Sequence, residues 1–126
     1  MHTRNPVACP SVALTIRNDT SEPMVLRDSA LPEGRWVLPP PPSLRPGEAA
    51  TVAASTGDDL GIGIRLTYSL PGGARAIFLA QTYRYGDSSV DGTRIEPDEG
   101  YVVHTQIDRR FPHMCAHYSV SLQDPT

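Results

Sequence analysis

The chain has 126 residues, the usual size of one domain, and a chain of this length buries roughly two thirds of the surface that it exposes when unfolded. The net charge is −3 and the 11 basic residues are scattered, so no basic face is available and nucleic acid is excluded as a partner. No segment approaches the ~20 apolar residues that span a bilayer, so we expect no transmembrane segment.

Alternation of apolar and polar residues, interrupted by Pro, Gly, Asn and Asp, predicts short strands along the chain. They are predicted at residues 12–17, 24–27, 35–38, 48–55, 62–70, 76–85, 101–107 and 116–122. Pro71-Gly72-Gly73 joins the clearest pair into a hairpin, whereas Pro39 to Pro42 predict a polyproline-type edge or loop. No apolar helical pattern runs for ten residues.

These elements predict one all-β domain over residues 1–126. The expected fold is an antiparallel β-sandwich of about 7–9 short strands with little or no helix. Asn18-Asp19-Thr20 fits an N-glycosylation pattern but is interpreted as a turn. Gly61-Ile62-Gly63 is not a dinucleotide fingerprint, and glycines inside or beside a strand predict a bulge or a close backbone approach.

His113, Cys115 and His117 have the residue types of a metal site. Alternate positions share one face of a strand, but the outer two are about 13 Å apart, too far for one ion to bind all three side chains. The even-numbered residues are predicted to face the core, so these three are expected on the wetter face. We predict no metal there and no cofactor elsewhere.

An acidic loop resembles a calcium loop in its alternate oxygen-bearing residues, which are Asp87, Ser89, Asp91 and Asp98. The loop has no flanking helices and no terminal Glu, so a polar connection between strands is the simpler interpretation. A calcium- or carbohydrate-binding accessory module stays open as a third function.

The two cysteines, Cys9 and Cys115, lie near opposite ends of the chain. A disulfide between them would close most of the chain and would contribute about 4–5 kcal/mol in the chain-entropy model. Two unpaired buried thiols are equally ordinary, and both alternatives stay open.

The sequence contains no nucleophile elbow and no histidine-containing catalytic signature. His104, as a general base, and Tyr68 are the candidates for an alternative function, a small enzyme or cyclase with a cavity between the sheets. We expect binding rather than catalysis. The candidate ligand-binding residues are Trp36, Tyr83 and Tyr85, because amphipathic rings favour sites with one apolar and one wet side. Core packing is the alternative for Trp36 and Tyr68.

Several segments in the N-terminal half resemble the aegerolysin-type family of small acidic β-sandwich proteins, which includes bacterial crystal-protein relatives. The resembling segments are Val12-Ala13-Leu14-Thr15-Ile16-Arg17-Asn18-Asp19-Thr20, Gly34-Arg35-Trp36, Leu44-Arg45-Pro46-Gly47 and Ser55-Thr56-Gly57. The resemblance implies a toxin-like protein that binds membrane lipid or a partner protein, since some members act with a larger pore-forming protein.

The sequence departs from that family in its single Trp and in residues 81–85, which lack the family's aromatic-Asn-Pro and Cys-Pro-Trp patterns. The fold therefore follows from the resemblance more firmly than lipid binding does. Met1-His2-Thr3-Arg4-Asn5-Pro6 has no apolar h-region, so we expect no signal peptide in this sequence. Both a cytoplasmic and a secreted soluble protein fit this start.

Overall fold

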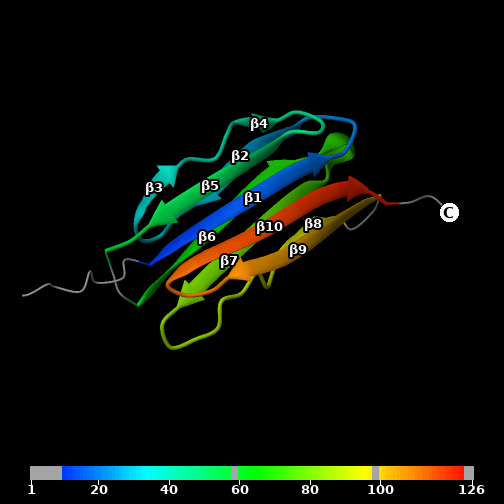
Figure 1. The fold of residues 1–126 in the computed structure, drawn as a ribbon. Helices are drawn as coiled ribbons and strands as arrows, with labels where there is room; N and C mark the ends of the chain where they lie inside the picture. Colours follow the sequence, from blue (N-terminus) through cyan, green and yellow to red (C-terminus); the bar gives the residue numbers. More distant parts are fainter. Residues whose placement is uncertain (1–9, 58–59, 98–99, 124–126) are drawn as a thin grey trace, which may run out of the picture.

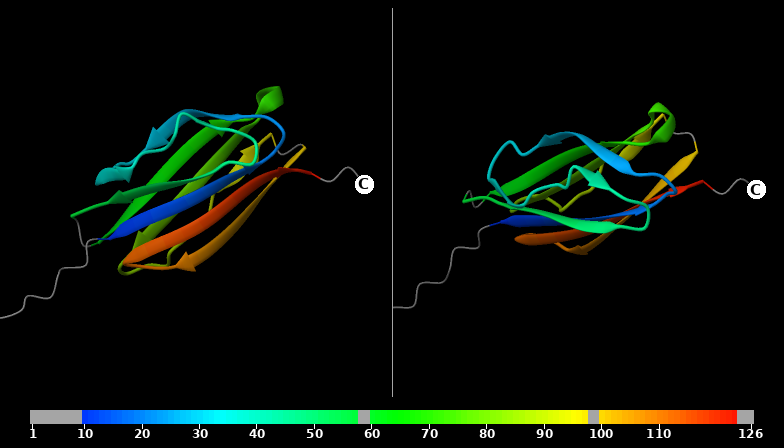
Figure 2. Two further views of the ribbon diagram at one scale, coloured as in Figure 1. Left: turned by 45° about the horizontal axis from the view of Figure 1, so that its top comes forward. Right: turned by 90° about the horizontal axis from the view of Figure 1, so that it is seen from above.

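A computed structural model, which describes residues 10–57, 60–97 and 100–123, contains two five-stranded sheets packed face to face (Figures 1 and 2). Sheet A has the order β3-β5-β1-β10-β9 and sheet B the order β4-β2-β6-β7-β8. The prediction of an all-β sandwich is confirmed. The strands are β1 (Ser11–Asp19), β2 (Met24–Ala30), β3 (Arg35–Leu38), β4 (Ser43–Leu44), β5 (Ala49–Ser55), β6 (Gly61–Ser69), β7 (Arg75–Tyr83), β8 (Arg94–Glu96), β9 (Tyr101–Arg109) and β10 (His113–Leu122).

Two details differ from the prediction. The described residues form ten strands rather than about 7–9, because β4 and β8 have only two and three residues and leave no alternating pattern in the sequence. The sandwich is also not wholly antiparallel. β1 and β10 pair in parallel from Ser11 opposite His113 to Asp19 opposite Ser121, and the other described strand pairs are antiparallel. Pro71-Gly72-Gly73 turns the chain as a short 3-10 helix, η1 (Pro71–Gly73).

The space between the sheets is filled by side chains that alternate with outward-facing residues along each strand. Three aromatic rings form its centre: Phe78 makes edge-to-face contacts with Tyr68 at 6.1 Å and with Tyr118 at 5.4 Å between ring centroids. The Tyr68 hydroxyl donates to the carbonyl of Pro41 at 2.7 Å, and that of Tyr118 donates to the carbonyl of Leu79 at 2.7 Å. Both buried phenols are therefore satisfied.

Asn18 is fully buried at the end of β1, where the chain turns toward β2. Its Nδ2 group donates to the carbonyls of Glu22 and Leu44, and its Oδ1 accepts from the backbone N–H and the hydroxyl of Thr20. Its backbone also pairs with Gly47 and Glu48. The expected turn at residues 18–20 is therefore only partly correct, because Asn18 and Asp19 still belong to β1 and the chain bends from Thr20 onward. The Asn18 amide fastens this bend to β4.

Replacing Asn18 with alanine is expected to lower the free energy of unfolding by about 2–4 kcal/mol, because buried donors and acceptors lose their partners. Urea titration measures this change. Asp19→Asn is the matched control, since Asp19 makes only an exposed ion pair with Arg17 and its loss changes stability by less than about 1 kcal/mol. Equal stabilities of the two variants would contradict the role of the Asn18 amide.

Candidate functional site

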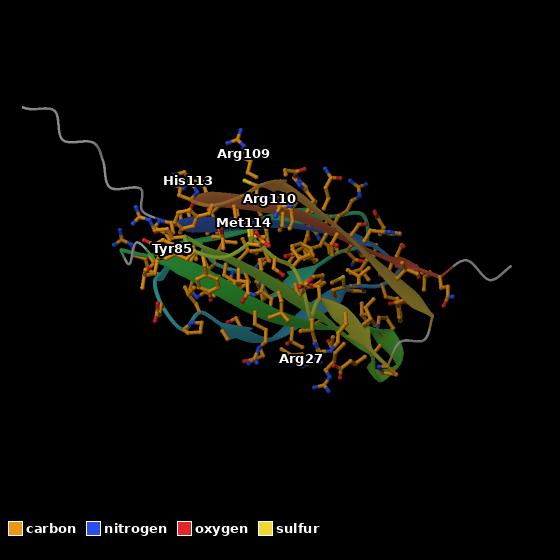
Figure 3. All side chains as sticks on the ribbon, turned by 90° about the horizontal axis from the view of Figure 1, so that it is seen from below. Arg27, Tyr85, Arg109, Arg110, His113 and Met114 are labelled. Atoms are coloured by element: carbon orange, nitrogen blue, oxygen red, sulfur yellow. The ribbon has the colours of Figure 1, made fainter. Side chains whose placement is uncertain are left out.

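Exposed apolar side chains gather at the end of the sandwich where β6 begins and β7 ends. We call this end the tip and define it by Leu60, Tyr83 and Tyr85, whose exposed fractions are 53%, 41% and 86%. The backbone N–H of Arg84 donates to the carbonyl of Leu60 at 2.8 Å and thereby holds the two segments together. Tyr85 lies toward the same end as His113 of the opposite sheet (Figure 3).

The Tyr83 ring lies against the two glycines of β6. Gly61 is paired with Tyr83 across the strands and has a φ of +150°, and a Cβ on Gly61 would collide with the Tyr83 ring. A Cβ on Gly63 would lie 3.4 Å from the Tyr83 hydroxyl oxygen. The expected close backbone approach is present at Gly61, where a Cβ would also lie 2.4 Å from the carbonyl oxygen of Thr82. The contact with the Tyr83 ring was not predicted.

A groove of about 560 Å³ runs along β6 beside this ring, on the outer face of sheet B. It exists because β2 pairs with β6 only as far as Ala30 opposite Arg65. Beyond that pair, residues 31–34 leave the sheet and form a wall at Pro32 and Glu33. The opposite wall includes Leu79, Gln81, Tyr83 and Asp91. This groove was not predicted from the sequence.

The three predicted ligand-binding residues fall in different environments. Tyr83 is the last residue of β7 and Tyr85 lies beyond it, both exposed. Trp36 lies on the edge strand β3 and is partly buried against the hydrophobic core, whereas the other three residues of β3 are exposed. The structure therefore brings Tyr83 to the groove and Tyr85 to the tip, and it gives Trp36 a packing role.

The two catalytic candidates do not share a cavity. His104 lies exposed on the outer face of sheet A, opposite Ser119 on β10, rather than between the sheets. Tyr68 lies in the filled core, with its hydroxyl bonded to Pro41. In the described part of the chain, the space between the sheets in which the enzyme alternative placed its cavity is filled by the side chains of the core.

Burial raises the pKa of Tyr68 to about 12 from the ordinary value of 10, and burial also raises the pKa of Tyr118. Above pH 10 the unfolded chain releases these protons before the folded protein does, so the free energy of unfolding is expected to fall between pH 10 and pH 12. Chemical unfolding at several alkaline pH values measures this slope. Tyr68→Phe removes one of the two groups and should flatten the slope; an unchanged slope would contradict the assignment.

The His-Cys-His segment lies on the outer face, as predicted, because Met114, Ala116 and Tyr118 face the core. The imidazole of His113 hydrogen-bonds the Ser11 hydroxyl at 2.8 Å, and that of His117 contacts the carboxylate of Asp108. The described residues include no group of three or more such side chains placed to hold a metal ion.

The acidic loop after β7 is organised by its own hydrogen bonds. The Ser89 hydroxyl accepts from the backbone N–H of Asp91 at 2.9 Å, and the Ser89 backbone pairs with that of Gln81. Asp87 and Asp91 are exposed. Asp98, the fourth calcium candidate, lies outside the described residues.

The disulfide between Cys9 and Cys115 stays an open alternative, because Cys9 lies outside the described residues. Cys115 is half-buried on the outer face of sheet A, between His113 and His117. In the described part of the chain, no helix has the length and hydropathy needed to cross a bilayer.

No protein-family model and no curated protein sequence matches this chain. Solved structures do match it. The lipid-binding protein Nakanori aligns with 90% of this chain and 71% of its own, at a TM-score of 0.73 and 11% identity. The RahU protein, solved in complex with a TRIS molecule, aligns with 93% of this chain and 98% of its own, at a TM-score of 0.72 and 9% identity.

A lectin from Xerocomus chrysenteron is a more distant match, with a TM-score of 0.54, 12% identity, and 88% and 99% of the two chains covered. At these identities the likeness establishes the fold alone. Nakanori and RahU both have aegerolysin-type folds, and the fold of this chain is similar to theirs.

Proposed function

We propose that the protein binds the surface of a lipid bilayer and that the tip is the part that enters it. The observation that carries this proposal is the exposure of Leu60, Tyr83 and Tyr85 on two neighbouring segments that a backbone hydrogen bond joins at one end of the sandwich. Tyrosine rings are favoured at the level of the lipid headgroups, where the ring is buried and the hydroxyl stays wet. A leucine beside them adds apolar area that would leave water on contact.

Basic side chains near the tip support the same orientation. The Arg84 guanidinium lies 5.9 Å from the centre of the Tyr85 ring, and Arg110 donates to the carbonyl of Ser88 in the loop that follows β7. Guanidinium groups at headgroup depth can donate to lipid phosphates while the rings pack below them. The similarity to a fold that serves a lipid-binding protein, Nakanori, is compatible with this function.

The area available at the tip predicts weak and reversible attachment. Three side chains bury little surface, far less than a spanning helix or two lipid anchors. The net charge of −3 gives no general attraction to anionic lipid, so the attachment is expected to depend mainly on apolar burial. We therefore propose binding to zwitterionic vesicles that persists when salt is raised.

Co-sedimentation with phosphatidylcholine vesicles tests the proposal. Tyr85→Ser and Leu60→Ser are each expected to weaken binding about tenfold, because each side chain loses apolar area worth roughly 1.4 kcal/mol. Leu122→Ser is the matched control. Leu122 is also 53% exposed, but it lies at the opposite end of β10, and its replacement should leave binding unchanged.

Two results would remove this function. The first is the absence of sedimentation with vesicles of any lipid composition, which would favour a partner protein as the target. The second is equal loss of binding in Leu122→Ser and Tyr85→Ser, because the attachment would then not depend on the tip.

A further inference from the structure

The groove beside Tyr83 has the features of a small-ligand site, and Tyr83 is the one tip residue that also lines it. Its volume of about 560 Å³ lies within the range of small-molecule pockets. It opens on the outer face of sheet B, whereas Leu60 and Tyr85 project from the end of the sandwich. We propose that this groove binds a neutral, hydroxyl-rich ring, that is, a pyranose sugar.

Part of the groove surface consists of two glycines and the aromatic ring of Tyr83. Gly61 and Gly63 carry no side chain, so the Tyr83 ring can lie against the β6 backbone and form part of the groove surface there. The Tyr83 ring is held against these glycines and remains 41% exposed. An aromatic ring fixed in this way offers an apolar surface for the C–H side of a sugar at little cost in side-chain entropy.

The groove offers both hydrogen-bond donors and hydrogen-bond acceptors. Over residues 61–64, the strand pairs that the described residues form reach β6 only from β7, since its pairing with β2 ends at Arg65. The free edge of a strand presents N–H donors and C=O acceptors. Glu33 and Asp91 add carboxylate acceptors, and Gln81 adds both kinds of group. Because each sugar hydroxyl both donates and accepts, this mixture suits a polyol.

The charged side chains at the groove favour a neutral ligand. Of the charged side chains that line the groove, Glu33 and Asp91 are acidic, and the basic Arg65 is paired with Asp28 at 3.3 Å. A phosphate or a sialic acid would meet this negative excess without a free cation to balance it. The groove therefore selects against anionic ligands.

Gly63→Val tests the proposal with minimal change to the fold. The valine would point into the groove, its Cβ has 3.4 Å to the nearest neighbour, and β-branched residues are favoured in strands. Thr67→Val is the matched control. Thr67 lies on the same face of β6, beyond the groove residues, and its replacement should leave binding unchanged.

The measurement is amide chemical-shift mapping with neutral methyl pyranosides, compared with a sialoside. We expect at least one neutral sugar to shift the amide resonances of residues 61–65 and 81–83. Its binding should be at least about tenfold weaker in Gly63→Val, and the sialoside should bind the unchanged protein at least about tenfold more weakly than the neutral sugar. A second arm uses phosphatidylcholine vesicles with and without a monoglycosyl ceramide. Added binding to the glycolipid vesicles that Gly63→Val removes would place the sugar on a lipid headgroup.

The proposal is overturned if neither free pyranosides nor the glycolipid produce binding that depends on Gly63. Its failure is distinguishable from failure of the proposed function, because vesicles of phosphatidylcholine alone contain no sugar and report only on the tip. Loss of binding to those vesicles in Tyr85→Ser, together with normal sugar shifts in that variant, would show that the two sites act separately.

Discussion

The parallel pairing of β1 with β10 is the constraint on which the rest of the fold depends. It joins residues 11–19 to residues 113–121 in the middle of sheet A, so the first and last described strands are neighbours. β5 and β3 attach to one side of this pair and β9 to the other. Without it, sheet A would separate into two fragments, and Val12, Leu14 and Ile16 would lose one of their two flanking strands. Contacts of such long sequence separation make sheet A dependent on both ends of the chain.

The two ends of the sandwich are built differently, and this difference separates the end that stabilises the fold from the end that we propose to bind lipid. At the end opposite the tip, the Asn18 amide fills all its hydrogen bonds inside the protein and fixes the β1–β2 turn against β4. At the tip, the loops expose apolar side chains instead. Binding residues commonly lie on loops that a rigid scaffold positions, because loops can vary without loss of the core.

The sequence predicted the long strands because their alternation is regular. Val12, Leu14 and Ile16, and likewise Met114, Ala116 and Tyr118, point inward as their spacing requires. β4 and β8 could not be predicted, since two or three residues show no period and their pairing depends on distant strands. The parallel register of β1 and β10 was also beyond prediction, because alternation fixes which residues face inward but not which strand lies beside which.

The residues of the candidate site could be predicted only in part from the sequence. Trp36, Tyr83 and Tyr85 were predicted from their residue type alone. Residue type does not distinguish the exposed rings of Tyr83 and Tyr85 from the ring of Trp36, which packs against the core on an edge strand. Gly61 and Gly63 were a real signal, since glycines in a strand indicate a close approach. The identity of the approaching group depends on the β6–β7 register, and the groove itself depends on the departure of β2 from the sheet after Ala30. Neither the β6–β7 register nor the end of the β2–β6 pairing can be predicted from a short stretch of sequence.

Tyr83 belongs to both proposed sites, and its position determines how they can be separated. Its ring lies against Gly61 and Gly63 and lines the groove, while Tyr83 stays 41% exposed and the next residue, Arg84, is hydrogen-bonded to Leu60. A ring held in one place loses little conformational entropy when a ligand arrives, whether that ligand is a sugar or a lipid headgroup. Replacing Tyr83 would therefore weaken either function and could not distinguish them. Gly63 lines the groove, whereas Tyr85 is exposed beyond the end of β7 and is not among the groove residues, so changes at those two positions test the two sites separately.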